Sequence, residues 1–377
     1  MTPSVLVAGA GIGGLTTALA LHRTGLGATV VEKACDLRPL GVGINLLPHA
    51  VRELDYLGLA DRLCDIAVAP SNISYFDTSG DLLFREPRGT AAGDSHPQLS
   101  VHRGELQALL LEAVTTRLGS AAVRTDHGLT GFTATEDGVV GHTEGGDLSA
   151  DVLVGADGIG SVVRDALHPA STPLVWSGVR MFRGAADDYA FLDGRTMAII
   201  AGDDAELVTY PIGSGRLNWV LQVPAGPPGP LPGDAGWNRP ADRAAVAALV
   251  RDWRLDWLDV SALISGTAEV FEYPMVDRDP LPRWGIGRVT LLGDAAHPMY
   301  PVGANGASQA IVDARVLADE LAAGTDGGLR RYEEKRRPAT AAVVEASRTM
   351  HSAQARRPAD IARVATQYRI DTTRSSS

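Results

Sequence analysis

Residues 4–14 read SVLVAGAGIGG, an apolar run followed at once by a cluster of glycines. Ser4–Ala8 has the composition of a buried strand, and the apolar spacing of Leu15–Arg23 predicts a helix directly after the glycines. Ala28–Glu32, which reads ATVVE, predicts a second strand. Because two strands joined by one helix over so short a stretch are typical of a parallel βαβ unit, we expect the chain to begin with one.

The glycines match the dinucleotide-binding pattern G-x-G-x-x-G, which runs from Gly9 to Gly14. Gly9 permits the tight turn, Gly11 lets the backbone approach a pyrophosphate, and Gly14 lets the helix pack close to the strand. Backbone amides at the helix N-terminus, those of Ile12 and Gly13 included, would donate to the phosphates. The strand before and the helix after the pattern argue against a glycine-rich turn without a function.

Glu32 ends the second strand, at the position where this fold usually places an acidic residue. A carboxylate there accepts hydrogen bonds from both hydroxyls of an adenosine ribose, and it repels a 2′-phosphate. The pattern therefore predicts FAD or NAD at this site and disfavours NADP. It leaves the choice between FAD and NAD open.

The overall composition limits the classes of function. The chain has 377 residues, of which 45% are hydrophobic and 21% charged, as in ordinary globular proteins. Its formal net charge of −11 disfavours nucleic-acid binding and an anionic membrane surface, and no apolar run approaches the roughly 18 residues that span a bilayer. Two cysteines, Cys35 and Cys64, form neither a disulfide framework nor a zinc cluster, and no leader pattern precedes the first strand. We expect a cytoplasmic protein without a bound metal.

The rest of the chain predicts an α/β nucleotide domain interrupted by a β-rich insertion. Alternating apolar stretches between residues 170 and 284 predict antiparallel strands with one apolar face; they are Thr196–Ala201, Leu207–Pro211 and Leu217–Val223. Pro224–Pro240 is so rich in Pro and Gly that it predicts a loop or lid. The remaining expected elements are the helices Arg103–Arg117, Gly306–Leu321 and Arg330–Arg357 and the buried strands Val152–Gly155 and Arg288–Gly293.

Two further segments narrow the choice of cofactor. Residues 151–164 read DVLVGADGIGSVVR, with Asp157-Gly158 after an apolar strand; residues 288–314 read RVTLLGDAAHPMYPVGANGASQAIVDA, with Gly293-Asp294 after another. The fingerprint, the Asp-Gly box and the Gly-Asp box in this order resemble the single-component flavin-dependent aromatic hydroxylases, the para-hydroxybenzoate hydroxylase-like monooxygenases. The resemblance extends from residue 5 to about residue 338 and implies tightly bound FAD.

This resemblance implies roles for residues around the flavin. Asp294 would hold a hydroxyl of the ribityl chain, and Arg103 would reach the FAD phosphates or that chain. Asp157 and Gly158 would contact the pyrophosphate and lie where NAD(P)H approaches. Residues 301–306 open a helix expected to begin near Ala307, whose amides would stabilise negative charge on the flavin N1/O2 edge. The full set of expected cofactor contacts is Gly9, Gly11, Ile12, Gly13, Gly14, Glu32, Lys33, Gly43, Ile44, Arg103, Leu129, Asp157, Gly158, Gly293, Asp294, Pro301, Gly303, Ala304, Asn305 and Gly306.

Several of these residues also have an ordinary structural explanation. An isolated Asp157 or Asp294 would most often cap a helix N-terminus, and an isolated Arg103 would be a solvated helix residue. His297 suggests a general base because histidine titrates near neutrality, but its place in the Gly-Asp box favours a structural role. Residues 41–45, GVGIN, resemble the loop beside the flavin, whose glycines let the ring swing between two positions.

The implied reaction is the hydroxylation of an aromatic ring. In this family NAD(P)H reduces FAD, the reduced flavin adds O2, and the resulting C4a-hydroperoxyflavin delivers one oxygen atom to an electron-rich ring. The chain has no second G-x-G-x-x-G, because Val163 occupies the third glycine position after Gly158. NADH or NADPH would therefore visit transiently, and the sequence does not decide between them.

The substrate is less constrained. Residues 41–59 and 299–311 look most like the phenazine-carboxylate hydroxylase branch, which couples hydroxylation to decarboxylation. We expect the β-rich insertion to wall the pocket, with Trp219, Tyr210 and Phe182 as the side chains available to stack on a flat ring; the candidate substrate contacts are Met181, Arg183, Tyr210, Trp219 and Pro301. Epoxidation or Baeyer–Villiger oxygenation of a polyketide, and a non-catalytic FAD- or NAD-binding sensor, remain alternatives.

The expected fold class is α/β, with a Rossmann-like FAD-binding domain, an inserted β-rich substrate domain and a C-terminal helical segment. Residues 1–70, 98–170 and 285–340 would form the FAD-binding domain, and residues 71–97 and 171–284 the substrate domain. Residues 341–377 would form a C-terminal helix and tail. A monomer and a homodimer are both compatible with the sequence.

Overall fold

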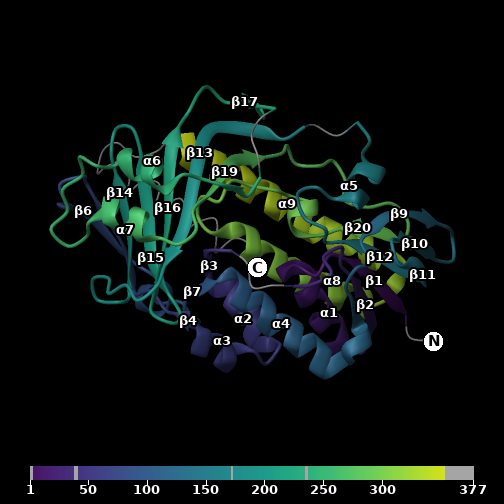
Figure 1. Ribbon diagram of the computed structural model, residues 1–377. Coiled ribbons are helices and arrows are strands. Elements are labelled where there is room, and N and C mark those ends of the chain that lie inside the picture. Colours follow the sequence, from purple (N-terminus) through teal and green to yellow (C-terminus); the bar gives the residue numbers. More distant parts are fainter. Residues whose placement is uncertain (1–2, 38–40, 171–172, 234–236, 353–377) are drawn as a thin grey trace.

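A computed structural model describes residues 3–37, 41–170, 173–233 and 237–352. A parallel sheet with its helices occupies one end of the molecule and a large, mainly antiparallel sheet the other (Figure 1). This arrangement confirms the expected α/β fold with a β-rich part inserted into it.

The expected βαβ unit is present at the start of the chain. β1 (Ser4–Ala8) pairs in parallel with β2 (Gly27–Val31), and α1 (Ile12–Arg23) connects them. The helix begins at Ile12 rather than Leu15, because the last glycines of the fingerprint already belong to its first turn. On its other side β1 pairs in parallel with β12 (Val152–Gly155), as expected for a buried strand.

The parallel sheet has the strand order β20-β12-β1-β2-β8, with β20 at Val289–Leu291 and β8 at Val123–Arg124. Its two faces are covered differently. Val7 lies on the face toward α1, which also packs against α4 (Arg103–Leu118) and α8 (Asn305–Ala322). Leu6 points the other way and contacts the small antiparallel sheet made of β9 (Leu129–Ala134), β10 (Val139–Thr143) and β11 (Gly146–Ala150).

The large sheet combines two separate segments of the chain, 72–87 and 175–277. Its order is β18-β19-β13-β16-β15-β14-β5-β6, with β17 beside β13, and only the β14–β5 pair is parallel. The bounds are β5 Asn72–Phe76, β6 Leu82–Pro87, β13 Val175–Ala186, β14 Thr196–Ala201, β15 Glu206–Ile212, β16 Arg216–Pro224, β17 Gly229–Pro230, β18 Arg239–Pro240 and β19 Phe271–Asp277. The Pro- and Gly-rich segment 224–240 contributes only the two-residue strands β17 and β18, and residues 234–236 of it lie outside the described residues.

The two faces of the large sheet have different neighbours. Asn218 and Tyr210 stand opposite each other in the β15–β16 ladder, and both contact Gly43 of the nucleotide-binding part. Trp219, one residue further along β16, therefore points to the opposite face. There it packs with Phe182 and Leu263, in a core covered by α6 (Arg243–Ala248) and α7 (Val260–Gly266).

This placement corrects the expectation that Trp219 and Phe182 line the substrate pocket. Trp219 is completely buried, and its indole N–H donates to the Thr267 hydroxyl oxygen at 2.9 Å. The strand pattern predicted an apolar side chain at this position, but period-2 alternation alone does not say which face of a sheet meets the cofactor. Trp219 holds α7 against the sheet instead.

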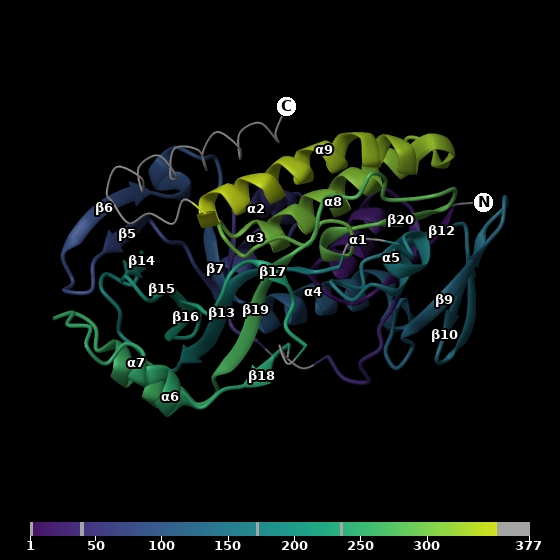
Figure 2. The ribbon, with the colours of Figure 1, turned by 90° about the horizontal axis from the view of Figure 1, so that it is seen from above.

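The chain ends on a long helix. α9 (Thr325–Ser352) lies along α8 (Figure 2) and contains Pro338. It begins before Arg330, where the helix was expected to start, and residues 353–377, which include the expected end at Arg357, lie outside the described residues. The other elements are β3 Gly43–Leu46, α2 Pro48–Tyr56, α3 Ala60–Ile66, β4 Ala67–Val68, β7 Leu99–His102 and α5 Val162–Leu167.

Neither a membrane helix nor a metal cluster is found in the part of the chain that the structure describes. None of its helices is both long and apolar enough to cross a bilayer. Within the same ranges, His, Cys, Asp and Glu side chains do not gather in groups of three that would hold a metal ion.

We expect Trp219→Ala to lower the free energy of unfolding by about 3–5 kcal/mol, because it empties a buried ring site and leaves the Thr267 hydroxyl without its donor. Thermal unfolding of the purified holoprotein measures the effect. Trp237→Ala is the control, since Trp237 is 53% exposed and its loss should change the melting temperature little. An unchanged melting temperature for Trp219→Ala together with a raised substrate KM would show that Trp219 lines the substrate pocket after all.

Candidate active site

The fingerprint turn has the geometry that its glycines predicted. Gly9 adopts a φ of +102°, and a Cβ at this position would lie 2.5 Å from the carbonyl oxygen of Ala156. A Cβ at Gly14 would lie 1.9 Å from the carbonyl oxygen of Gly9. At Gly11 no atom lies within 4 Å of an added Cβ, so the turn is open on the side where a pyrophosphate would approach.

Two side chains hold this turn in place. Glu32 accepts a hydrogen bond from the Ala10 amide at 2.8 Å and another from the Ala34 amide at 3.0 Å. Gln107 of α4 donates to the carbonyl oxygen of Ala10 at 2.8 Å. Glu32 thus ties the turn to the end of β2, where a ribose would lie. Sequence reasoning missed Gln107, because nothing in its local pattern indicates a partner so far away in the chain.

The Asp-Gly box connects the parallel sheet to α5. Asp157 accepts hydrogen bonds from the Ser161 hydroxyl at 2.5 Å and the Val162 amide at 2.8 Å, so its carboxylate satisfies the N-terminus of α5. Burial raises the pKa of this carboxyl, and the bond from Ser161 opposes that shift. The N-cap of α5 is Ser161, whose hydroxyl oxygen accepts from the Arg164 amide, and Asp157 supports this helix start from four residues earlier. Gly158, at a φ of +78°, has open space beside it and stays a proposed cofactor contact.

The Gly-Asp box forms a short 3-10 turn, Gly293–Ala295, directly after β20. The Asp294 side chain reaches solvent, yet surrounding protein desolvates it enough to raise the pKa of its carboxyl, while His297 and Arg103 act in the opposite direction. We call the accessible surface that Asp294 shares with Gly306 the cofactor cleft. Gly306 lies at the same place, since a Cβ there would be 3.8 Å from Oδ1 of Asp294.

α8 begins at Asn305, slightly earlier than the expected start near Ala307. The preceding residues, Gly303 and Ala304, have φ values of +82° and +60°, which turn the chain into the helix. Asn305 is 5% exposed, and its side-chain amide donates to the carbonyl oxygen of Gly303 at 3.3 Å. The start of α8 lies beside Asp294, since Gly306 belongs to its first turn, and an anionic flavin edge is the kind of group that the free amides of a helix start stabilise.

His297 lies behind this cleft rather than in it. The side chain is 3% exposed, and its Nε2 lies 2.5 Å from Oδ2 of Asp313. This buried contact agrees with the structural role favoured from the sequence.

The segment expected as a flavin-side loop is partly a strand. Gly43–Leu46 forms β3, which pairs antiparallel with β7, and only residues 41 and 42 before it are irregular. His102 donates to the carbonyl oxygen of Gly41 at 2.8 Å, and the Arg103 amide donates to that of Val42 at 3.0 Å. Residues 41–46 are therefore held along their length, which contradicts the expectation that this whole segment is a loop.

Gly43 is the point where the nucleotide-binding part meets the large sheet. Its amide donates to Oδ1 of Asn218 at 2.6 Å, and its carbonyl oxygen accepts from the Tyr210 hydroxyl at 2.9 Å and from Nη2 of Arg183 at 3.2 Å. Burial lowers the pKa of Arg183 and raises that of Tyr210 to about 12, the latter shift being opposed by Arg183. Two of the proposed substrate contacts thus bind the backbone beside the cofactor cleft. Asn218 was missed, because its role depends on a contact with a distant segment.

An apolar wall continues from these residues across the inner face of the sheet. Val179, Met181 and Met275 cluster with Tyr300 of the segment after the Gly-Asp box. Met181 is 5% exposed, whereas Pro301, next to Tyr300, is exposed. Arg183 and Met181 are two residues apart in β13 and therefore lie on the same face of the strand.

The remaining expected cofactor contacts lie at the edges of this site. Lys33 is exposed beside Gly128, where an added Cβ would lie 2.8 Å from Cβ of Lys33. Leu129, the next residue, and Ile44 are partly buried against the main core. Their contact with a cofactor stays a prediction.

These residues fit FAD. The fingerprint offers amides and an open surface, and the cleft beyond it contains Asp294 and the start of α8. In the described part of the chain, two buried donors near Gly43 have no partner, Nε of Arg183 and Nδ2 of Asn218. Unsatisfied buried donors are costly, so a bound acceptor is expected in front of them.

Comparison with known proteins agrees with this fit. The model of the FAD-binding-domain family matches residues 2–347. The chain belongs to this family of flavoproteins. It is 47% identical to the phenazine 1,6-dicarboxylic acid hydroxylase of Lysobacter antibioticus over 98% of this chain and 97% of that protein. It is 35% identical to the 3-hydroxybenzoate 6-hydroxylase 1 of Aquipseudomonas alcaligenes, over 92% and 88% of the two chains.

A solved structure supports the fold. The crystal structure of Klebsiella pneumoniae HpxO, complexed with FAD and uric acid, superposes with a TM-score of 0.81 over 98% of this chain and 92% of that one, at 24% identity. The comparisons confirm the prediction that this chain is an FAD-dependent aromatic monooxygenase that uses NAD(P)H and O2. They argue against the alternative of a non-catalytic sensor.

We expect Gly43→Ala to weaken the junction at the cleft, because the new Cβ would lie 2.7 Å from Cβ of Asn218. The overpacking should cost about 1–3 kcal/mol and disturb the hydrogen bonds of Gly43. Thermal unfolding and flavin content measure the change. Gly131→Ala, also in a strand but with open space around it, is the matched control. Equal melting temperatures and flavin contents for the two variants would contradict the role of Gly43 at this junction.

We expect Asp294→Asn to raise the Kd for FAD roughly tenfold or more, since an amide of the same shape replaces a charged acceptor. Titration of the flavin-depleted protein by flavin fluorescence measures this change. Asp203→Asn, in the exposed turn between β14 and β15, is the control. The same Kd for both variants would remove Asp294 from the FAD site.

Proposed function

We propose that this monooxygenase hydroxylates a phenazine carboxylic acid. The observation that carries the proposal is the 47% identity, over almost the full length of both chains, to the phenazine 1,6-dicarboxylic acid hydroxylase. Several other relatives are named for single-ring acids and share much less of the sequence, such as the 35% identical 3-hydroxybenzoate 6-hydroxylase 1. Whether hydroxylation is coupled to loss of CO2 is an outcome of the experiment below.

The chemistry of the pocket supports a flat, fused-ring substrate. Met181 and Tyr300, each 5% exposed, belong to the apolar cluster on the same side of the sheet as Arg183, and their exposed edges are suited to an aromatic ring. In this proposal Arg183, Tyr210 and Pro301 lie at the end of the pocket nearest the flavin. Arg183 keeps Nε without a partner in the described part of the chain, and this donor is suited to an anionic or carbonyl oxygen.

The bound flavin supplies the chemistry, carrying electrons from NAD(P)H to O2 and one oxygen atom to the ring. The residues of this chain hold and shield it. In this proposal Gly9–Gly14 and Glu32 bind its dinucleotide end, Asp294 holds its ribityl chain, and the start of α8, Gly303–Gly306, stabilises the negative charge of its reduced ring. The large sheet excludes water from the reacting centre. The reaction as proposed requires no acid–base pair from the protein.

The finer organisation belongs to the same proposal. Residues 1–70, 98–170 and 285–340 form the FAD-binding domain, and residues 71–97 and 171–284 form the substrate domain, which is supported by the segments that build the large sheet. We propose a cytoplasmic enzyme that acts as a monomer or homodimer without nucleic acid. Cys35 and Cys64 are both unpaired and exposed, which is the state that a reducing compartment maintains.

The test is a comparison of substrates with the purified holoenzyme. Phenazine-1,6-dicarboxylate and phenazine-1-carboxylate should accelerate NADH or NADPH oxidation more than 3-hydroxybenzoate and salicylate do, and yield a product with one oxygen from labelled O2. Mass spectrometry shows whether CO2 is lost. Stimulation by the single-ring acids alone, or H2O2 as the only product with every phenazine, would overturn the proposed substrate.

A further inference from the structure

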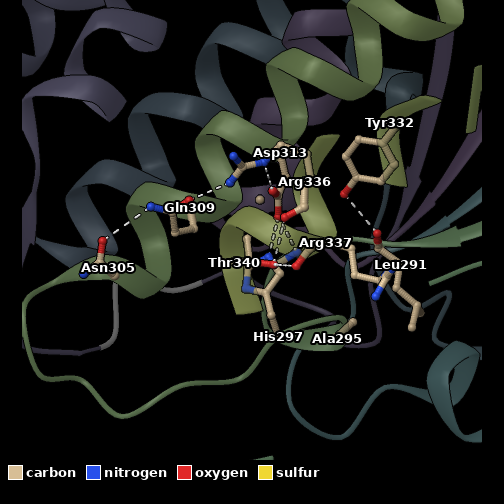
Figure 3. Close-up of polar contacts among 12 residues, drawn as sticks. Leu291, Ala295, His297, Asn305, Gln309, Asp313, Tyr332, Arg336, Arg337 and Thr340 are labelled. Atoms are coloured by element: carbon tan, nitrogen blue, oxygen red, sulfur yellow. Dashed lines mark hydrogen bonds and ion pairs between the residues drawn. The ribbon is translucent and has the colours of Figure 1, made fainter. Parts of the chain in front are cut away.

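A group of buried charges lies between α8 and α9, behind the proposed flavin site. Asp313 of α8 is completely buried, and Arg336 of α9 and His297 of the Gly-Asp box are each 3% exposed. Figure 3 shows the three side chains meeting. Removing charged groups from water is costly, and apolar residues would pack two helices as well. The position of the group relative to the cofactor cleft suggests what it does.

Asp313 holds the turn that carries Asp294 at both of its ends. Its Oδ2 accepts a hydrogen bond from the Gly293 amide at 3.2 Å and lies 2.5 Å from Nε2 of His297. Asp294 lies between these two residues, and its side chain makes no hydrogen bond or ion pair within the described ranges. The backbone segment that carries Asp294 is therefore held by a buried residue of α8.

Arg336 makes two contacts with the same side of α8. Its Nε donates to Oδ1 of Asp313 at 2.7 Å, and its Nη2 donates to Oε1 of Gln309 at 2.5 Å. Asp313 and Gln309 are four residues apart, so one planar guanidinium spans one helical turn. Gln309, 1% exposed, then donates to Oδ1 of Asn305, the first residue of α8, at 3.4 Å.

The surrounding charges keep Asp313 and the neighbouring His49 each in one ionisation state near neutral pH. Burial raises the pKa of Asp313, but the charges and hydrogen bonds of His297 and Arg336 outweigh it and lower the pKa overall. The carboxylate thus stays ionised. His49, which lies 3.5 Å from Nε2 of Gln309, has its pKa lowered to about 4 by burial and by Arg336, so it stays neutral near neutral pH.

We propose that Arg336 is a positioning residue for FAD. Through Asp313 it fixes the turn that presents Asp294, and through Gln309 it fixes Asn305 at the start of α8. A side chain of α9 thereby aligns the two segments that hold the ribityl chain and the flavin edge. The inference rests on the proposed roles of Asp294 and of residues 303–306.

The experiment uses two variants of nearly unchanged size. Arg336→Met removes the whole guanidinium. Gln309→Met removes the contacts of Gln309 with Arg336 and with Asn305, while the Asp313–Arg336 pair remains. Arg330→Met is the control, because Arg330 lies on the same helix and pairs with Glu334 at the surface. The Kd for FAD, the visible spectrum and reduction potential of the bound flavin, and the melting temperature are measured for each.

Both buried variants should raise the Kd for FAD, Arg336→Met roughly tenfold and Gln309→Met less, and change the spectrum or potential of the flavin that remains bound. The control should match the wild type. A lower melting temperature with an unchanged Kd, spectrum and potential would show a merely structural role and overturn the proposal.

If Arg336→Met does not fold, Gln309→Met decides alone: an unchanged Kd, spectrum and potential in it overturns the proposal. Asp294→Asn separates this inference from the site on which it rests. If Asp294→Asn raises the Kd for FAD while Arg336→Met and Gln309→Met leave it unchanged, only the positioning role is refuted. An unaffected Asp294→Asn refutes the cofactor assignment itself.

Discussion

The cofactor cleft depends on one close contact, the approach of the first turn of α1 to the carbonyl oxygen of Gly9. The space there is so small that a Cβ on Gly14 would lie 1.9 Å from this oxygen. A side chain at Gly14 would push the helix away from β1 and move its free amides away from the position of a pyrophosphate. Glu32 and Gln107 then bind the Ala10 amide and carbonyl, so a side chain directly after β2 and one from α4 hold the turn that the glycines make possible.

A second constraint joins the nucleotide-binding part to the large sheet. Gly43 forms hydrogen bonds with three strands of the large sheet: its amide donates to Asn218, and its carbonyl oxygen accepts from Tyr210 and Arg183. Because polar groups at this junction are buried, breaking one of them costs more than its net contribution in water. The inner face of the sheet therefore keeps a defined position relative to the nucleotide-binding part. An oxygen atom transferred at a fixed place on the ring requires such a defined position.

Local patterns predicted the elements well but not the side of the sheet on which each residue lies. The fingerprint, β1, α1 and β2 follow from glycine positions and apolar spacing, and the structure contains all of them. Trp219 lies on a correctly predicted strand but on the face away from the cleft, because the choice between two apolar faces depends on what packs against each. Asn218, the residue before Trp219, points to the opposite face and therefore reaches Gly43. A single polar residue between apolar ones does not predict such a contact.

The residues that sequence reasoning missed share a cause: each acts through a partner far away in the chain. Gln107 binds Ala10, Asn218 binds Gly43, and Arg336 binds Asp313. The proposed FAD site is likewise assembled from segments between Gly9 and Gly306 that come together only in the folded protein. The unfolded chain therefore has no comparable site, and bound FAD stabilises the fold by mass action, by about 2.7 kcal/mol when free FAD is a hundred times its Kd. A substitution that loosens any of these distant contacts thus lowers FAD affinity and, through it, the stability of the whole enzyme.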